Sequence, residues 1–372
     1  MSEKELKAMY RTRTEGHFPE SMEVLGRAYT KVDDLRYGTN PHQPAAFYRP
    51  ADDTGLVLGA YTMLKTGKSG LSQTNLEDMH HAVGILKYMD RPACAVMKHC
   101  NPSGAAIQQD GMPLVAVYQR ARDADAQAAF GSVVAFNVEV DEGTAAEIMQ
   151  TIVEGVVAPA FSEGALAAFN DRERFKRNKD IRIVQIPNPG GLPKYQDDTP
   201  NAWEMKLFDD GSLVLAQPYL SRMKSADDFV LAYNDHKKKG RIDITRKPTA
   251  QEMDDLLFAW RVNLHVRSNG VVIVHNGQTL AVGTGEQDRV GAVQQAVSKA
   301  QSKYKGEESL EGAVMASDGF FPFRDAVDAA TDAGITALAQ PGGSVNDYDA
   351  IAACNEKEAT MVFTLERCFS HH

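Results

Sequence analysis

The chain has no long apolar run, few cysteines and none of the common metal or triphosphate motifs. No stretch of its 372 residues approaches the ~18 apolar residues that a membrane helix needs, and the N-terminus lacks the apolar core of a signal peptide. We therefore expect no membrane association and a cytoplasmic location. Cys94, Cys100, Cys354 and Cys368 form no CxxC pair, which predicts reduced thiols and no zinc site.

The chain also lacks a basic excess. It has 40 Lys and Arg against 50 Asp and Glu, a formal net charge of −10. Nucleic-acid-binding surfaces need many cations to meet phosphates, so we expect no nucleic-acid partner. A small anionic substrate is compatible with this charge, because a few local Arg or Lys side chains suffice for one phosphate.

Strand-like and helix-like segments alternate, which predicts an α/β fold with parallel strands. We expect strands at 93–97, 132–136, 156–158, 313–316, 335–339 and 360–364, and a hairpin of 270–274 with 279–282. The segment 101–104 is expected to be a polar turn. Helices are expected at 20–29, 72–89, 113–129, 142–153, 226–236, 249–262, 290–304, 325–333 and 348–356.

One stretch differs in character from the rest. Residues 170–212 are rich in charge, Pro and Gly, which indicates a crossing between two globular units that is partly hairpin. The length also favours two domains. We therefore predict an N-terminal extension at 1–34, a first unit at 35–205 and a second unit at 206–372.

Two segments could carry polar chemistry. Lys98 and His99 follow an apolar strand, at an edge where α/β proteins place ligands. They offer a cation and a base that titrates near neutral pH, but a solvated surface pair is an equal alternative. The turn at 283–289 has two glycines before a helix, and is either an anion cradle or an ordinary tight turn.

Other segments could bind a ring or an anion. Phe320, Phe321 and Phe323 surround Pro322 and form either a wall for a flat heterocycle or a core wedge. Asp325 beside them could bind an amino-substituted ring. The polar stretches 35–43 and 340–344 are binding loops or ordinary turns.

Taken together, these motifs point to one family. The pieces LRYGTNPHQ, KHCNPSGAA, DADAQAAFGSVVAFN, RSNGVV, GTGEQDRV, ASDGFFPFRDAVD, QPGGSVND and RCFSHH span residues 35 to 371. Their sequence and order closely resemble the AICAR transformylase domain of the bifunctional AICAR transformylase/IMP cyclohydrolase family. AICAR is 5-aminoimidazole-4-carboxamide ribonucleotide. Each piece alone is weak, but the combination is highly specific.

The resemblance implies a fold and a reaction. The fold would be two cytidine-deaminase-like αβα units in tandem, working as a homodimer with sites at the interface. The reaction would transfer a formyl group from the co-substrate 10-formyltetrahydrofolate to the 5-amino group of AICAR, giving FAICAR and tetrahydrofolate. Only 34 residues precede Leu35, too few for a cyclohydrolase domain. We therefore expect a stand-alone transformylase, with a separate protein closing the ring to IMP.

The resemblance also implies site residues. The catalytic residues would be Lys98, His99 and Asn269. The folate-binding residues would be Phe320 and Asp325. The residues that bind AICAR would be Arg36, Tyr37, Phe130, Gly131, Glu154, Arg289, Arg367, Phe369 and His371.

The resemblance suggests a cation but no metal chemistry. Some members bind a monovalent cation near the positions of Val266 and Asp318, and we allow for one in this chain, although Val266 has no hydroxyl. No metal is expected in catalysis, because the formyl carbon already has the required oxidation level. A zinc deaminase of similar fold is disfavoured, because its His/Cys-x-Glu and Pro-Cys-x-x-Cys motifs are lacking. A non-catalytic nucleotide or folate sensor on the same scaffold stays an alternative.

The expected chemistry agrees with these residue types. The AICAR amine is a poor nucleophile, because its lone pair is delocalised into the ring and carboxamide. His99 would act as the base, while Lys98 and Asn269 would stabilise the tetrahedral oxyanion or assist the leaving nitrogen.

Overall fold

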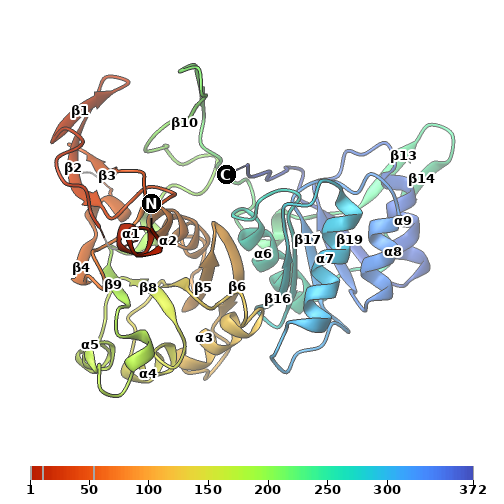
Figure 1. Ribbon diagram of the computed structural model, residues 1–372. Helices are drawn as coiled ribbons and strands as arrows, with labels where there is room; N and C mark the ends of the chain where they lie inside the picture. The colour runs from red at the N-terminus through yellow and green to blue at the C-terminus, as the bar shows by residue number, and fades with distance from the viewer. Residues whose placement is uncertain (1, 11, 53–54, 372) are drawn as a thin grey trace.

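A computed structural model describes residues 2–10, 12–52 and 55–371. Within these residues, no helix has the length and apolar character needed to span a membrane. The chain is a mixed α/β protein, as the alternating pattern predicts (Figure 1).

A twelve-stranded sheet runs through the molecule, and its two halves repeat one strand order (Figure 1). In space the strands are β12 (Val230–Leu231), β19 (Thr360–Phe363), β18 (Ala337–Gln340), β17 (Val314–Ser317), β15 (Val271–His275), β16 (Gln278–Gly283), β6 (Asn101–Ile107), β5 (Ala93–Lys98), β7 (Ser132–Phe136), β8 (Val153–Ala158), β9 (Arg182–Gln185) and β4 (Thr62–Lys65). The halves meet where β16 pairs antiparallel with β6, Gln278 opposite Ala106. Each half thus places a hairpin at the centre of the sheet.

The predicted hairpin is confirmed as β15–β16, whereas the parallel pairing expected for the other strands holds only in part. β7, β8 and β9 are parallel, as are β17, β18 and β19. The hairpins β5–β6 and β15–β16 are antiparallel, and β5 and β15 also pair antiparallel with β7 and β17. Strands joined by a turn of two residues have to run antiparallel.

The first hairpin differs from the sequence-based expectation. Lys98 pairs with Asn101, and the two residues between them, His99 and Cys100, have φ of 53° and 61°. This is the geometry of a tight hairpin turn. The segment 101–104 therefore opens β6 and is not a loop. A register shift opposite Pro102 accommodates a residue that has no N–H for the ladder.

Helices cover both faces of the sheet and give the expected αβα layering. On one face, a single core joins α2 (Gln73–Leu86) and α6 (Ala250–Asn263) across both halves. The opposite face has a separate core in each half. Its helices are α3 (Leu114–Asp123), α4 (Glu142–Ile148) and α5 (Glu163–Asn170) in the first half, and α7 (Arg289–Ser302), α8 (Asp325–Asp332) and α9 (Asp347–Glu356) in the second. The relation to cytidine deaminases stays a prediction.

The start of α6 shows how local sequence fixes these elements. Thr249 Oγ1 accepts from the Glu252 amide, and Glu252 Oε2 accepts from the Thr249 amide, which is the predicted capping box. Arg246 and Thr336 also donate to the Glu252 carboxylate. Burial opposes ionisation of Glu252, but these hydrogen bonds outweigh it and lower the pKa to about 2.

Smaller elements surround the large sheet. They are α1 (Glu3–Met9), the three-stranded sheet of β1 (Ser21–Val24), β2 (Arg27–Leu35) and β3 (Ala45–Pro50), and the hairpins β10 (Glu204–Leu207) with β11 (Leu213–Ala216) and β13 (Tyr233–His236) with β14 (Gly240–Asp243). Single turns of 3₁₀ helix lie at Leu58–Ala60, Lys176–Asn178, Pro189–Gly191 and Ala226–Asp228. The β10–β11 hairpin projects from the middle of the molecule (Figure 1).

Two expected helices are wrong. Residues 20–29 form strands β1 and β2 around a turn at Leu25 and Gly26, both with positive φ. Residues 226–236 form a 3₁₀ turn and strands β12 and β13. The predicted crossing at 170–212 contains the first strand and the turn of the β10–β11 hairpin, and the expected boundary at 205/206 falls within β10. The division into units stays a prediction.

Candidate active site

The β5–β6 turn presents Lys98 and His99. Lys98 ends β5, and its Nζ donates to the carbonyl of Gly131 at 2.6 Å. Gly131 has a φ of 72°, and a Cβ there would lie 3.1 Å from Lys98 Nζ, so glycine suits this contact. His99 lies exposed on the turn, and Phe130, beside Gly131, has 60% of its surface exposed.

A buried carboxyl lies beneath this turn. Asp78, on α2, accepts from the Cys100 amide at 2.7 Å. Burial raises the pKa of Asp78 to about 7, although the Cys100 hydrogen bond and the charge of Lys98 act against the rise. Glu154 and Glu77 raise it further. The Asp78 carboxyl therefore changes its charge near neutral pH, next to the Lys98 ammonium.

Arg36, Tyr37 and Glu154 form a second group, close to the first. The Arg36 guanidinium lies 4.6 Å from the Tyr37 ring centroid and donates to the Tyr37 hydroxyl at 3.2 Å. Asn75 accepts from Arg36 at 3.5 Å and donates to Glu154 Oε2 at 2.9 Å. The charges of Glu154 and Lys98 both shift the pKa of Asp78, which places these two residues near the same carboxyl. The structure thus gathers Arg36, Tyr37, Glu154, Lys98, His99, Phe130 and Gly131 in the first half, and we call them the first-half cluster.

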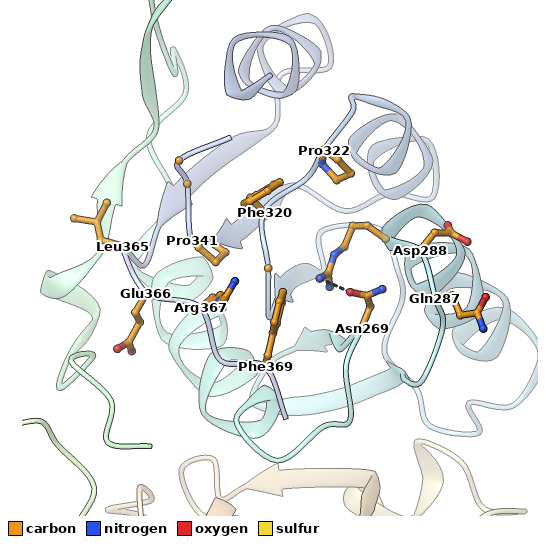
Figure 2. A pocket seen from close by; sticks show the side chains of 14 residues that line it. Asn269, Gln287, Asp288, Phe320, Pro322, Pro341, Leu365, Glu366, Arg367 and Phe369 are labelled. Atoms are coloured by element: carbon orange, nitrogen blue, oxygen red, sulfur yellow. Dashed lines mark hydrogen bonds between the residues drawn. The ribbon is translucent and has the colours of Figure 1, made fainter. Parts of the chain in front are cut away.

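The second half holds a cavity of about 620 Å³, which we call the aromatic pocket (Figure 2). Figure 2 shows Phe369 between Arg367 and Asn269, with Phe320 and Pro341 further along the wall. Phe320 and Phe369 are 46% and 40% exposed, so their rings are available to a ligand. Five expected site residues line this pocket: Asn269, Arg289, Phe320, Arg367 and Phe369.

The Asn269 amide is held in one orientation. Its Nδ2 donates to the Glu286 carbonyl at 2.9 Å, and its Oδ1 accepts from Arg289 Nη2 at 2.7 Å, drawn as a dashed line in Figure 2. The Glu286 carbonyl also accepts from the Asn269 backbone amide. The glycine-containing turn 283–289, one of the ambiguous motifs, thus holds Asn269 in place.

Asp318 lies behind the pocket wall. Its Oδ1 accepts from Arg289 Nη1, and its Oδ2 accepts from the Gly270 amide at 2.7 Å and from the Ser268 hydroxyl. Asp318 is fully buried, and Arg289 keeps 5% of its side chain exposed. Arg289 therefore already supplies the charge that compensates this carboxylate.

These contacts bear on the expected cation. Both Asp318 oxygens are occupied, and Val266 offers no side-chain oxygen. Asn263 Oδ1 is a buried acceptor that has no partner among the described residues. Both oxygens of the Asp318 carboxylate thus already have partners in the protein, and the cation stays a prediction. Within the described residues, no group of three or more His, Cys, Asp and Glu side chains could hold a metal ion.

The C-terminal segment closes one side of the aromatic pocket. Arg367 lies over the Phe369 ring at 4.8 Å from its centroid. The Ser268 amide donates to the Ser370 carbonyl at 3.0 Å, and the Cys368 amide donates to the Asp318 carbonyl at 3.1 Å. Two backbone hydrogen bonds thus hold the C-terminal segment against the loop that carries Asn269 and against Asp318.

Of the expected site residues in the second half, two lie outside the pocket lining. His371 has its ring 6.1 Å from that of Phe369 and faces a different hollow, which Trp203 and Tyr219 also line. Asp325 is exposed at the start of α8, where its carboxylate accepts from the Ala326 amide.

The Lys98–His99 turn borders a hollow lined by residues of both halves. Lys98 and His99 line a groove of about 260 Å³ whose other wall includes Thr284 and Lys299. At its edge, Asn101 Oδ1 accepts from the Arg267 amide at 2.9 Å and from the Thr284 hydroxyl at 2.8 Å. Asn269 follows Arg267 by two residues, or at most ~7 Å of extended chain. The turn and the aromatic pocket are therefore neighbours.

Comparison with known proteins decides the family. A sequence model of the AICARFT/IMPCHase bienzyme family matches residues 4–299. This chain belongs to that family. The chain is also 39% identical, over 360 residues, to the bifunctional purine biosynthesis protein PurH of Acetivibrio thermocellus. That match covers 96% of this chain and 62% of the relative, so the chain spans less than two thirds of the relative's length.

The AICARFT/IMPCHase match confirms the resemblance drawn from the motifs. Its range includes Lys98, His99, Asn269 and Arg289, whereas Phe320 and the C-terminal segment lie beyond it. Residue roles stay predictions. Sequence reasoning gave no role to Asn75 or Asp78, although both are polar residues on the otherwise apolar face of α2, a signal that could have been read.

Proposed function

We propose that this chain transfers the formyl group of 10-formyltetrahydrofolate to the 5-amino group of AICAR, releasing FAICAR and tetrahydrofolate. The proposal is supported by family membership and above all by one observation. The turn with Lys98 and His99 is hydrogen-bonded, through Asn101, to the loop that leads to Asn269. A base and two groups able to stabilise an oxyanion thus belong to one region.

We assign the nucleotide to the first-half cluster and to the arginines of the aromatic pocket. AICAR carries a phosphate, which suits guanidinium groups because they donate in pairs. Arg36 is partly exposed and Arg367 is exposed, so both can reach a ligand. The Tyr37 ring and the Glu154 carboxylate, held by Arg36 and Asn75, suit the base and the ribose hydroxyls.

We assign the folate to the aromatic pocket. Phe320, Pro322, Pro341 and Phe369 give it apolar walls. A flat pterin ring gains from stacking on an aromatic face. Asp325, exposed at the start of α8, is the acidic group that we assign to the amino-substituted end of that ring.

The bond changes follow from these roles. The AICAR amine attacks the formyl carbon while His99 takes its proton. Lys98 Nζ and the Asn269 amide stabilise the negative oxygen of the tetrahedral intermediate. In the structure, Lys98 Nζ donates to the Gly131 carbonyl. The bond from carbon to N10 then breaks, and N10 takes up the proton that His99 received from the amine, which restores the neutral base. Acid–base help of this kind contributes ~10²–10⁴-fold, so much of the rate comes from holding the two substrates together.

We propose that the working form is a homodimer. Both strands of the β10–β11 hairpin are exposed along their whole length. Trp203, Leu207 and Val214 are 59%, 63% and 49% exposed. An isolated two-stranded hairpin is marginal in water, and its open edges favour pairing with another chain. A second copy on this hairpin would cover these side chains.

We assign ring closure to IMP to a separate enzyme. The relative is a bifunctional protein, and the match spans 62% of it, so its activities do not transfer to this chain as a pair. The cytoplasmic location also stays a prediction. The sensor hypothesis differs in one outcome: a sensor would bind AICAR without turnover.

The direct test is release of tetrahydrofolate by the purified chain. It should appear only when AICAR and 10-formyltetrahydrofolate are both present. Tight AICAR binding without release would contradict the proposal and favour the sensor.

A further inference from the structure

Asp318 is the common anchor of three parts of the aromatic pocket. Its side chain is fully buried, and it is not itself among the lining residues. It binds the loop of Asn269 through the Gly270 amide and the Ser268 hydroxyl. It binds Arg289 through Nη1, and its own carbonyl accepts from Cys368 in the C-terminal segment.

These contacts form a chain from a buried charge to a substrate-facing amide. Arg289 Nη1 is occupied by Asp318 Oδ1 and by the Gly270 carbonyl. This fixes the plane of the guanidinium, so that Nη2 donates to Asn269 Oδ1 at 2.7 Å. An amide that accepts at Oδ1 has to present its NH₂ on the other side, where one N–H goes to the Glu286 carbonyl. The second N–H is left for a ligand.

We propose that Asp318 is a positioning residue for formyl transfer, acting through Arg289 on the orientation of Asn269. The inference rests on the proposed function and adds a residue to it. Without the carboxylate, Arg289 loses the contact that fixes its plane, and the Asn269 amide can turn. The N–H aimed at the developing oxyanion is then no longer held in advance, and such preorganised donors stabilise the transition state.

The test is a double-mutant cycle on turnover. Asp318→Asn and Asn269→Ala are each expected to lower kcat by about 10²-fold, the usual loss of one oxyanion donor, with KM for AICAR changed less than kcat. The double variant should be no slower than Asn269→Ala alone, because both changes remove one interaction. A purely structural role would make the two losses multiply.

A matched control separates burial from positioning. Asp255 is 2% exposed and accepts from the amides of Asn276 and Gly277 at the far end of the β15–β16 hairpin, away from the pocket. Asp255→Asn removes the same charge and should keep wild-type kcat. Equal losses for Asp255→Asn and Asp318→Asn would overturn the proposal.

If Asp318→Asn does not fold, Ser268→Ala takes its place in the double-mutant cycle. It removes the hydroxyl that donates to Asp318 Oδ2 and accepts from the Ser370 amide, and it leaves the ion pair of Asp318 with Arg289 in place. We expect a smaller loss of kcat that again does not add to that of Asn269→Ala. An additive loss overturns the proposal. If the wild type turns over and Asp318→Asn has no effect on turnover, only this inference is refuted. If the wild type does not turn over, the proposed function itself is refuted.

Discussion

Asn101 joins the turn of the first half to a loop of the second by accepting a hydrogen bond from the Arg267 amide at 2.9 Å. It lies two residues after His99, and Arg267 lies two residues before Asn269. The Thr284 hydroxyl bonds the same oxygen. Two segments 166 residues apart are thereby held together, and the proposed base and the proposed oxyanion donor lie on the two sides of this contact.

The first prediction concerns the base. His99→Ala should lower kcat by about 10²–10⁴-fold, because the amine then attacks without a positioned proton acceptor. Binding of AICAR should stay within a few fold, since His99 is exposed on the turn and its backbone carbonyl, which the variant keeps, is the group that accepts from Asn101 Nδ2. Turnover is measured by tetrahydrofolate release and binding by calorimetry.

His17→Ala serves as the control, because His17 is also exposed but belongs to the N-terminal segment. Unchanged turnover in His99→Ala would remove the proposed base from the mechanism.

The second prediction separates the two substrates. Phe320→Leu keeps an apolar side chain but removes the aromatic face, so KM for 10-formyltetrahydrofolate should rise by about 5–10-fold, the size of a lost aromatic contact. KM for AICAR should change less than twofold. Phe323→Leu is the matched control, because Phe323 is 62% exposed but does not line the pocket. A rise in KM for AICAR alone would reverse the assignment of the pocket.

The third prediction is a pH dependence of stability. Burial raises the pKa of Asp78 from 3.8 to about 7. Between these values the folded chain keeps a proton that the unfolded chain has released, so wild-type stability falls as pH rises through this window. Asp78→Asn cannot ionise but still accepts from Cys100. Its stability relative to wild type should rise from pH 4 to pH 7 by up to a few kcal/mol, because one pKa unit equals about 1.4 kcal/mol.

Urea unfolding at pH 5 and pH 8 measures this difference. Asp110→Asn is the control, because Asp110 is exposed and should show no such trend. If the difference in unfolding free energy between Asp78→Asn and the wild type is the same at both pH values, the raised pKa of Asp78 is contradicted.

The fourth prediction tests the homodimer. Leu207 lies opposite Leu213 in the β10–β11 ladder and is 63% exposed. Leu207→Asp should convert a dimer of the 40.7 kDa chain into a monomer, because burying an unpaired carboxylate in an apolar interface is costly. Light scattering measures the mass. Val345→Asp, at a position that is 82% exposed, should stay dimeric. A monomeric wild type that turns over normally would contradict the dimer proposal.

Much of the fold follows from local patterns. The helix that begins after Thr249 is fixed by its capping box, and the strand before Lys98 by an apolar run buried on both faces. The expected helices at 20–29 and 226–236 fail because tight turns at Leu25–Gly26 and around Gly240 set the chain into hairpins. A hairpin is held by hydrogen bonds between one strand and the next. A helix-like spacing of apolar residues over a short stretch does not exclude such pairing.

The sequence gives candidate site residues, whose roles stay predictions, but not the geometry that joins them. Motifs identify Asn269, Arg289 and Phe320, and the structure brings all three to one pocket. The Asp318 carboxylate, which binds Arg289 and the loop of Asn269, bonds Arg289 across 29 positions and Ser268 across 50. Such pairings depend on the strand order of the sheet, which short-range patterns do not specify.

The most direct test of the account is product analysis with AICAR and 10-formyltetrahydrofolate. The purified chain should release tetrahydrofolate and accumulate FAICAR in equal amounts, without IMP. Chromatography with mass detection distinguishes the two nucleotides. Formation of IMP would reveal a ring-closing activity that we assign to a separate enzyme, and absence of FAICAR would contradict formyl transfer itself.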